Sequence, residues 1–241
     1  MLYADITNEV THMEDVLRAN AVQKAQDAGE RRKYLTYANM LWLFTAGSLL
    51  GVAGEGLHSL LKRGYWETHV VSLGLPLCIL YGLGAVGCYA GYCLLPRRNY
   101  FAQFLTYALV GTLLELLAGA LLDLGLGMRA WNYSYKPFNF RGYICLSASI
   151  GWGAVGVLFT LLLARPLDRV FARLHGRLFT ALTVLLTVYL AIDFFFTGVS
   201  LLRWSGRHFG KFARTALGKF IDRAFPDPFM KKRFVEWRFL R

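Results

Sequence analysis

The chain has 241 residues, of which 56% are apolar and 17% charged, and it carries a formal net charge of +12. Most of the charges lie between long apolar segments, which is a membrane-protein composition and argues against a soluble domain. The positive charge lies in the expected loops and the C-terminal segment, where it can meet anionic lipid headgroups, so nucleic acid is not an expected partner.

Residues 1–34 are expected to form an amphipathic helix. Ile6, Val10, Met13 and Leu17 follow one another at spacings of three or four residues, which predicts one narrow apolar stripe. We interpret the segment as a solvated helix packed on the membrane domain. A helix lying on the membrane, or pairing with another helix, is the alternative. The segment has no apolar core of a cleavable signal, so the first membrane span must act as the insertion signal.

Residues 35–204 are expected to form one transmembrane domain of about five spans. The apolar segments lie at about 37–62, 71–95, 101–127, 143–164 and 178–202. A bilayer core about 30 Å thick needs roughly 20 helical residues, and a helix is the one single segment that satisfies its own backbone there. The sequence therefore predicts an all-α, multi-pass helical bundle with amphipathic helices at both ends.

The orientation and the second segment are less determined. Five crossings would place the two ends of the chain on opposite sides of the membrane, and the distribution of Lys and Arg slightly favours a cytoplasmic C-terminus. Segment 71–95 is rich in glycine and contains Pro76, so it is the candidate for a re-entrant segment instead of a crossing.

Four acidic residues lie inside the apolar segments: Glu55, Glu115, Asp123 and Asp193. A carboxylate in the bilayer costs roughly 2.5–3.5 kcal/mol, so such residues usually face a protein interior or a water-filled cavity. Glu115 shares a helical face with small residues, namely Ala108, Gly111, Thr112 and Gly119. Such a face lets a neighbouring helix approach closely.

A polar cleft is the functional expectation. We expect it to be lined by Glu55, His58, Glu115 and Asp123, with Glu55 and His58 close enough to share a proton. Asp193 is expected to pair with a polar group on a neighbouring span. The alternative is that each carboxyl is neutral and only pins helix packing, because burial raises a carboxyl pKa.

The loop 128–142 is too aromatic for a plain solvated loop. We interpret it as a structured re-entrant hairpin that plugs or lines the cleft, and an interfacial loop anchored by Trp131 and Tyr133 is the alternative. The four cysteines, Cys78, Cys88, Cys93 and Cys145, lie in apolar segments without metal-ligand spacing, so we expect no metal site, no disulfide and no cofactor.

Residues 205–241 are expected to be a basic amphipathic tail. A basic stripe is expected from Arg203, Arg207, Lys211 and Arg214, and apolar residues at helical spacing accompany it: Phe209, Phe212, Leu217, Phe220 and Ile221. Pro226 and Pro228 should end this helix. A basic helix with an apolar face is typical of the membrane interface, so anionic lipid is the expected partner and a cytosolic protein the alternative. A second basic stripe is expected from Arg165, Arg169, Arg173 and Arg177.

Several enzyme and nucleotide motifs are absent from the sequence. It has no GxxxxGK[ST] phosphate loop, no HExxH and no GxSxG, so an ATP-driven process would need a separate ATPase subunit, and no enzymatic activity is expected. Two GxxxG spacings, at Gly47–Gly51 and Gly87–Gly91, are interpreted as packing surfaces within the bundle, with a homo-oligomer as the alternative.

Four ordered motifs resemble those of the type IV ABC-transporter permease family of CmpB-like membrane proteins. The loop and the start of the next span carry twelve matches: Trp131, Tyr133, Ser134, Phe138, Asn139, Gly142, Ile144, Cys145, Leu146, Ser149, Trp152 and Gly153. The segment before it matches at Gly74, Cys78, Tyr81, Gly82, Gly84 and Ala85. Two glutamate motifs match at Ser48, Leu50, Gly51 and Glu55, and at Leu114, Glu115, Gly119, Leu122 and Asp123.

The resemblance covers about residues 40–165, and more loosely the span around Asp193. It implies a multi-pass protein of the cell membrane that acts as a permease-like transport component; a non-transporting membrane scaffold is the alternative. Two departures matter, because Asn132 stands where the family has Asp and Tyr143 where it has Arg. If those two residues pair in charge in the family, this chain has a neutral contact in their place.

Overall fold

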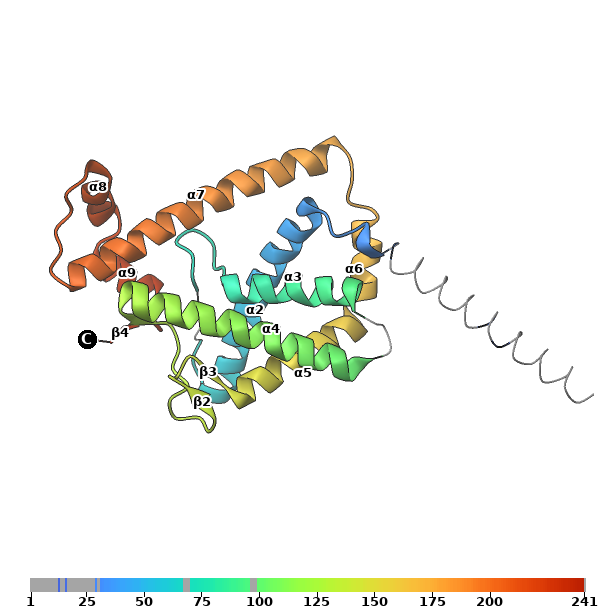
Figure 1. The fold of residues 1–241 in the computed structure, drawn as a ribbon. Helices are drawn as coiled ribbons and strands as arrows, with labels where there is room; N and C mark the ends of the chain where they lie inside the picture. The colour runs from blue at the N-terminus through green and yellow to red at the C-terminus, as the bar shows by residue number, and fades with distance from the viewer. Residues whose placement is uncertain are drawn as a thin grey trace, which may run out of the picture.

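The structure, a computed structural model, describes residues 31–66, 70–95 and 99–240, together with residues 13, 16 and 29. The amphipathic helix expected over residues 1–34 therefore lies almost entirely outside the described residues. Within them the molecule is a helical bundle with very short strands, which confirms the all-α class (Figure 1).

The bundle is built from eight helices in the described part of the chain. They are α2 (Tyr37–Arg63), α3 (Ile79–Leu94), α4 (Tyr100–Ala120), α5 (Leu146–Leu162), α6 (Ala164–Phe171), α7 (Arg177–His208), α8 (Ala216–Ala224) and α9 (Asp227–Arg233), and a π-helix, η1 (Leu121–Leu126), continues α4. Two antiparallel pairs join β1 (Met128–Arg129) to β4 (Arg238–Phe239) and β2 (Asn139–Phe140) to β3 (Ile144–Cys145).

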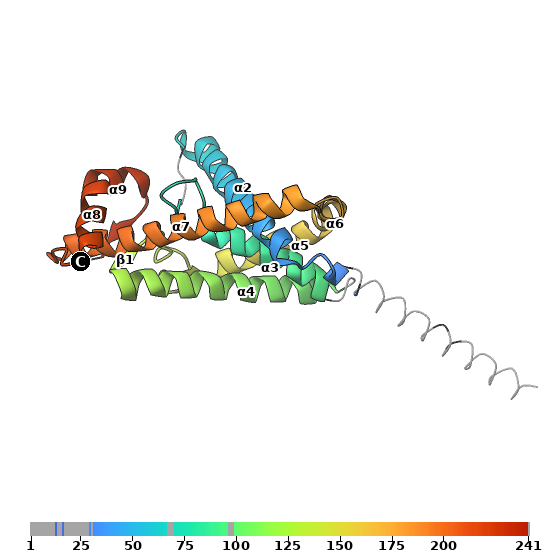
Figure 2. The ribbon, with the colours of Figure 1, turned by 90° about the horizontal axis from the view of Figure 1, so that it is seen from above.

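The long helices alternate in direction along the bundle. α4 and α7 run toward the end that carries α8 and α9, α3 and α5 run away from it, and α2 crosses them obliquely (Figures 1 and 2). The start of α2 and the strand β4 therefore lie at opposite ends of the bundle.

Local chemistry explains where several helices begin and end. The side chain of Thr36 accepts a hydrogen bond from the Asn39 amide and caps α2, and Asn99 does the same for α4 through the Ala102 amide at 2.9 Å. Such side chains satisfy amides that the first helical turn leaves without partners. α2 ends at Gly64, whose φ of 81° is a left-handed conformation.

Three or four of the five expected spans have a counterpart among the described residues. Three helical segments there have the length and composition of a span, at Tyr37–Arg63, Tyr100–Leu126 and Arg177–His208, and a fourth needs α5 and α6 together, which are bent by 55°. Segment 71–95 forms a non-helical turn, in which the Val71 amide donates to the Leu77 carbonyl at 2.7 Å, followed by α3, which has only 16 residues. Pro76 explains the late start of α3, because proline lacks an amide hydrogen and disfavours helical backbone at the residue before it.

The two basic stripes need correction, since neither lies on one helix. Arg165 and Arg169 are on α6, which ends before Arg173, and Arg177 begins α7 after Gly176 with its φ of 93°. The tail likewise turns at Gly210, whose φ is 72°. It then forms two short helices, with the boundary between them at Pro226.

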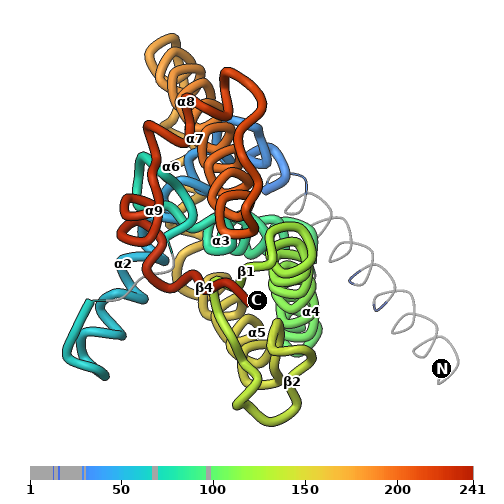
Figure 3. The backbone as a smooth tube through the Cα atoms, turned by 90° about the vertical axis from the view of Figure 1, so that its left-hand side faces the viewer, coloured from blue at the N-terminus to red at the C-terminus, as the bar shows by residue number. Residues whose placement is uncertain are grey.

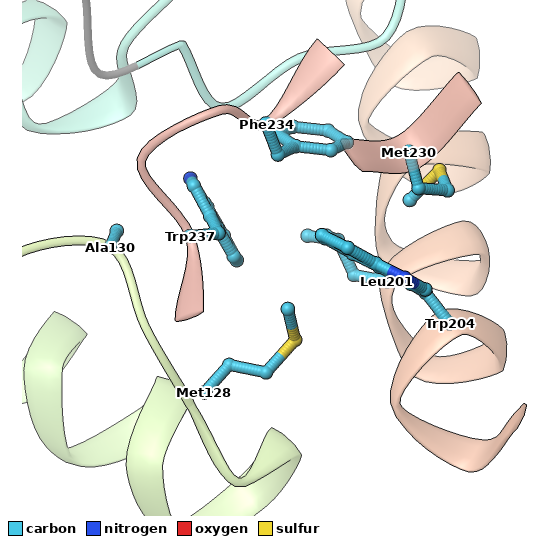
Figure 4. Close-up of a cluster of buried hydrophobic side chains, with 7 residues drawn as sticks. All are labelled: Met128, Ala130, Leu201, Trp204, Met230, Phe234 and Trp237. Carbon is cyan, nitrogen blue, oxygen red and sulfur yellow. The ribbon is translucent and has the colours of Figure 1, made fainter. Parts of the chain in front are cut away.

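The tail folds back onto the bundle and closes its end. Its apolar side chains form a core with residues of α7 and of the loop after η1: Met128, Ala130, Leu201, Trp204, Met230, Phe234 and Trp237 (Figure 4). Met128 and Met230 are completely buried in it. The pairing of β4 with β1 places the last described residues beside the loop that leads to α5 (Figure 3).

Candidate functional site

Glu115 lies on the buried, small-residue face of α4 and is 7% exposed. Gly111 and Gly119 flank it one turn away on either side. A Cβ atom at Gly111 would overlap the ring of Trp152, and one at Gly119 would come within 2.9 Å of the Cβ atom of Tyr143. The two glycines therefore leave room for the aromatic side chains of Trp152, on α5, and Tyr143, in the loop. The sequence analysis assigned this room to the close approach of a neighbouring helix.

The motif loop supplies the hydrogen-bond donor for Glu115. The Tyr133 hydroxyl donates to Glu115 Oε1 at 3.2 Å. Burial, followed by the charge of Glu115, raises the pKa of Tyr133, so the hydroxyl keeps its proton. The Trp152 side chain interacts with the same carboxylate, while the buried Oε2 atom has no hydrogen-bond partner in the described part of the chain. One oxygen of Glu115 is thus held and the other remains available.

Glu55 joins the same group of side chains from α2. The Tyr81 side chain, on α3, makes a hydrogen bond with Glu55. Both Glu55 and Tyr81 also interact electrostatically with Tyr133. We call the five residues Glu55, Tyr81, Glu115, Tyr133 and Trp152 the carboxylate–tyrosine cluster. Tyr133 is therefore hydrogen-bonded to Glu115 and interacts electrostatically with Glu55, while a polar cleft shared by the two glutamates stays a prediction.

Two residues predicted for the same cleft lie elsewhere. His58 is exposed on α2, because the buried face of that helix runs through Ser48, Val52, Gly56 and Ser59, and His58 lies about 100° around the helix from Ser59. Asp123 lies about two turns further along, in the π-helical turn η1, where its carboxylate binds Arg129 and Tyr143.

Asp123 is the centre of a separate network. Its Oδ2 atom accepts from the Tyr143 hydroxyl at 2.6 Å and from Arg129 at 3.0 Å. Arg129 also reaches Asn132 Oδ1 at 3.5 Å. The two positions that depart from the family pattern, Asn132 and Tyr143, thus lie in one network, with Arg129 and Asp123 as its charged pair.

Asp193 holds the non-helical segment 70–78 in place. Its carboxylate accepts from the Ser72 hydroxyl and, at 2.8 Å, from the Gly74 amide. One turn later, Thr197 accepts from the Leu73 amide at 3.0 Å. The expected polar partners of Asp193 therefore exist, but they belong to the turn before α3 and not to a helix.

The motif loop is a structured hairpin. The Trp131 indole donates to the Tyr143 carbonyl at 2.8 Å, and the Tyr133 amide to the Gly142 carbonyl at 2.9 Å. Asn132 caps the turn by accepting from the Ser134 amide at 2.9 Å. These bonds orient the loop so that the Tyr133 side chain points at the cluster.

Two further motif residues complete the hairpin. Asn139 donates to the Lys136 carbonyl at 2.8 Å and accepts from the Gly142 amide at 3.3 Å. Cys145, buried at the start of α5, pairs across the short sheet with Asn139. The motif residues of the loop are therefore spaced along the sequence as this one folded hairpin requires.

A small pocket adjoins the cluster at Trp152. It lies between α3, α4 and α5 and is lined by glycine, aromatic and mainly apolar residues: Gly84, Gly87, Cys88, Tyr107, Val110, Gly111, Leu114 and Trp152. The pocket lining is apolar, and the polar cleft stays a prediction.

Sequence reasoning missed two features. Tyr81 stood in a family motif, but its contact with Glu55 joins different helices and leaves no local signal. Asp168 was hidden in an arginine-rich stretch, yet its two oxygens accept from the Tyr89 and Tyr92 hydroxyls, both at 2.7 Å. These bonds fasten α6 to α3.

The chain was then compared with known proteins. A family model with the description "Putative ABC-transporter type IV" matches residues 42–198. This range contains the whole carboxylate–tyrosine cluster as well as Asp123 and Asp193. No curated protein and no solved structure matches the chain.

Proposed function

The chain belongs to this ABC-transporter family, and from that membership we propose that it is the permease-like membrane component of a transporter. The proposal places the functional centre at the carboxylate–tyrosine cluster. Membership and the apolar helices make it a transporter-related membrane protein. The permease role, the cleft and the cargo site belong to the proposal.

The free oxygen of Glu115 is the observation that carries the proposal. A buried carboxylate oxygen without a partner is costly, since leaving a buried polar atom unsatisfied costs about 1–3 kcal/mol. A purely structural carboxylate would be expected to use both oxygens. With Glu55 in the same cluster, Glu115 is suited to bind a proton or a small cation during a transport cycle.

We further propose that energy is supplied by a separate ATPase subunit. The sequence has no phosphate-binding loop of its own, and ABC transport by definition uses ATP. Cross-linking in native membranes followed by mass spectrometry should recover a subunit that carries a GxxxxGK[ST] loop. We assign no catalytic activity to the chain itself.

The experiment that tests the site replaces Glu115 by Gln and by Leu. Glu115→Gln keeps the shape but cannot ionise, so it should abolish the complementation of a deletion strain while stability falls by about 1 kcal/mol or less. Glu115→Leu should damage both, because it removes the hydrogen bond and fills the space beside Gly119. Folded yield and thermal unfolding in detergent are measured beside the growth phenotype.

Asp123→Asn is the matched control, because it neutralises a carboxylate near the same helix that lies in another network. It should keep activity in proportion to its folded yield. A fully active Glu115→Gln protein would remove the ionisable role and favour a non-transporting scaffold.

A further inference from the structure

The outer face of α8 is an exposed surface that is divided into an apolar edge and a basic edge. Leu217 and Phe220 are 43% and 55% exposed and lie one turn apart. Lys219 and Arg223, also exposed, follow at neighbouring positions around the helix. In the loop before α8, Phe212 is 90% exposed. A helix with this division is typical of a membrane interface.

The acidic residue of α8, Asp222, points away from the outer face and inward to α7. It pairs with Arg203 at 2.6 Å and also with Arg207. Both arginines are engaged in these inward ion pairs, and Arg207 also pairs with Asp227 at 2.6 Å. The outer face therefore presents only lysine and arginine among its charged residues.

The same ion pairs set the depth of α8 relative to the bilayer. α7 has 32 residues, so it is about 48 Å long and exceeds a bilayer core of about 30 Å. Its apolar stretch ends at Leu202, and Arg203 is the first charged residue beyond it. Because Asp222 binds Arg203 and Arg207, α8 lies beside the turns of α7 that follow the apolar stretch. In a bilayer crossed by the apolar stretch of α7, this is the level of the lipid headgroups.

We propose that the outer face of α8, together with the loop 209–215, rests on an anionic lipid surface. Phe212, Leu217 and Phe220 enter the boundary between headgroups and acyl chains, and Lys219 and Arg223 contact lipid phosphates. The surface lies outside the family-matched region and away from the carboxylate–tyrosine cluster, so it is independent of the transport proposal.

The test uses full-length protein in nanodiscs of phosphatidylcholine, with and without phosphatidylglycerol. A spin label is placed at position 220 through Phe220→Cys, and its accessibility to oxygen and to a water-soluble nickel complex is measured. A label at position 192, through Ile192→Cys in the middle of α7, gives the deep reference. In discs with phosphatidylglycerol the label at 220 should lie at the headgroup level, protected from nickel at least about threefold relative to phosphatidylcholine discs.

Charge-reversal variants separate attraction to anionic lipid from burial that does not depend on lipid charge. Lys219→Glu with Arg223→Glu should remove the effect of phosphatidylglycerol. Lys231→Glu with Lys232→Glu, the same charge change at exposed positions of α9, should retain it. A label at 220 that is open to nickel in both lipids would overturn the proposal and point to a protein partner on this face. Protection that is equal in both lipids and indifferent to charge reversal would overturn the role of anionic lipid.

Discussion

Tyr133 connects the motif loop to the membrane helices through a single hydroxyl. It donates to Glu115 Oε1, and it interacts electrostatically with Glu55 as well. Loss of that hydroxyl would remove the hydrogen bond that ties the motif loop to Glu115.

Tyr133→Phe should therefore couple to Glu115→Leu, which removes the acceptor of the same bond. Tyr133→Phe alone should cost about 0.5–1.5 kcal/mol, the usual range for one hydrogen bond, and the double variant should cost less than the sum of the two single changes because both remove the same bond. Thermal unfolding in detergent of the four proteins gives the coupling energy. Additive effects would mean that the two side chains do not interact.

Gly142 is the residue on which the hairpin conformation depends most directly. Its φ is 73°, and a Cβ atom there would lie 2.5 Å from Asn132 Oδ1. Gly142→Ala should cost about 1–2 kcal/mol from the left-handed conformation alone, with a further loss from the clash. Gly125→Ala, in open space with no atom within 4 Å, is the control and should be close to neutral. Equal melting temperatures for the two variants would contradict the described turn.

Residues of the site were predictable where their chemistry was unusual for a membrane. Glu55 and Glu115 stood out because charge in an apolar segment is rare. Tyr81 and Trp152 could not be assigned, since an aromatic residue in a span is ordinary and only the fold shows which of them touch a carboxylate. His58 was misplaced because a three-residue spacing alone does not say which face of a helix is buried.

At the scale of elements, the non-helical segment 70–78 is held by side chains from two distant helices. Asp193 and Thr197 of α7 accept from its amides, and Arg233 of α9 donates to the carbonyls of Ser72 at 2.7 Å and Leu75 at 2.6 Å. Non-helical backbone inside a membrane domain is tolerated only where protein satisfies it in this way. No local pattern could reveal these partners, which lie more than 100 positions away.

Arg233→Ala should loosen this segment. Three carbonyls, those of Ser72, Gly74 and Leu75, would lose their donor. Amide hydrogen exchange in residues 70–78 should therefore accelerate at least about tenfold, which corresponds to a loss of about 1.4 kcal/mol. Lys232→Ala, at the exposed neighbouring position, should leave exchange unchanged. Mass spectrometry of exchange in detergent makes the comparison, and unchanged exchange in Arg233→Ala would show that α9 does not hold the segment.

Asp222 makes the docking of α8 dependent on pH. The hydrogen bond from Arg203, followed by that from Arg207, lowers the pKa of Asp222 below its ordinary value of 3.8. A lowered pKa in the folded state means that the stabilisation is present above pH 3.8 and is lost as the pH falls through the folded-state value.

The thermal stability of the wild type should therefore fall as the pH drops below about 4. Asp222→Asn should be less stable at neutral pH, by about 1.5–3 kcal/mol for lost bonds to charged donors, and its acid dependence should be flatter. Parallel acid curves for the two proteins would show that Asp222 does not supply this dependence.

At the scale of the whole molecule, the described N-terminal residues and strand β4 lie at opposite ends of the bundle (Figure 1). The five crossings expected from the sequence would place the two ends on opposite sides of the membrane, and the described residues hold three or four candidate spans. The composition was enough to predict a helical membrane bundle, because long apolar segments indicate burial in lipid. It could not predict that α3 begins only at Ile79 or that the tail returns to the bundle.

Accessibility labelling should therefore give opposite results at the two ends. Single cysteines at Lys33 and Val235, placed in a variant without the four native cysteines, are exposed to a membrane-impermeant thiol reagent in intact cells. One should react and the other should react only after lysis. Equal reactivity would mean that the two ends share one side of the membrane, with segment 71–95 as the part that fails to traverse it.

The pairing of β4 with β1 has a consequence for biogenesis. Residues 128–129 enter the membrane machinery long before residues 238–239 are translated, yet each pair is the other's partner. The base of the motif loop therefore stays unpaired, and Met128 and Trp204 stay uncovered, until every span has been inserted. During that interval the nascent protein exposes an apolar patch that a chaperone or insertase would have to shield, and ribosome stalling before residue 230 would leave the loop unfinished.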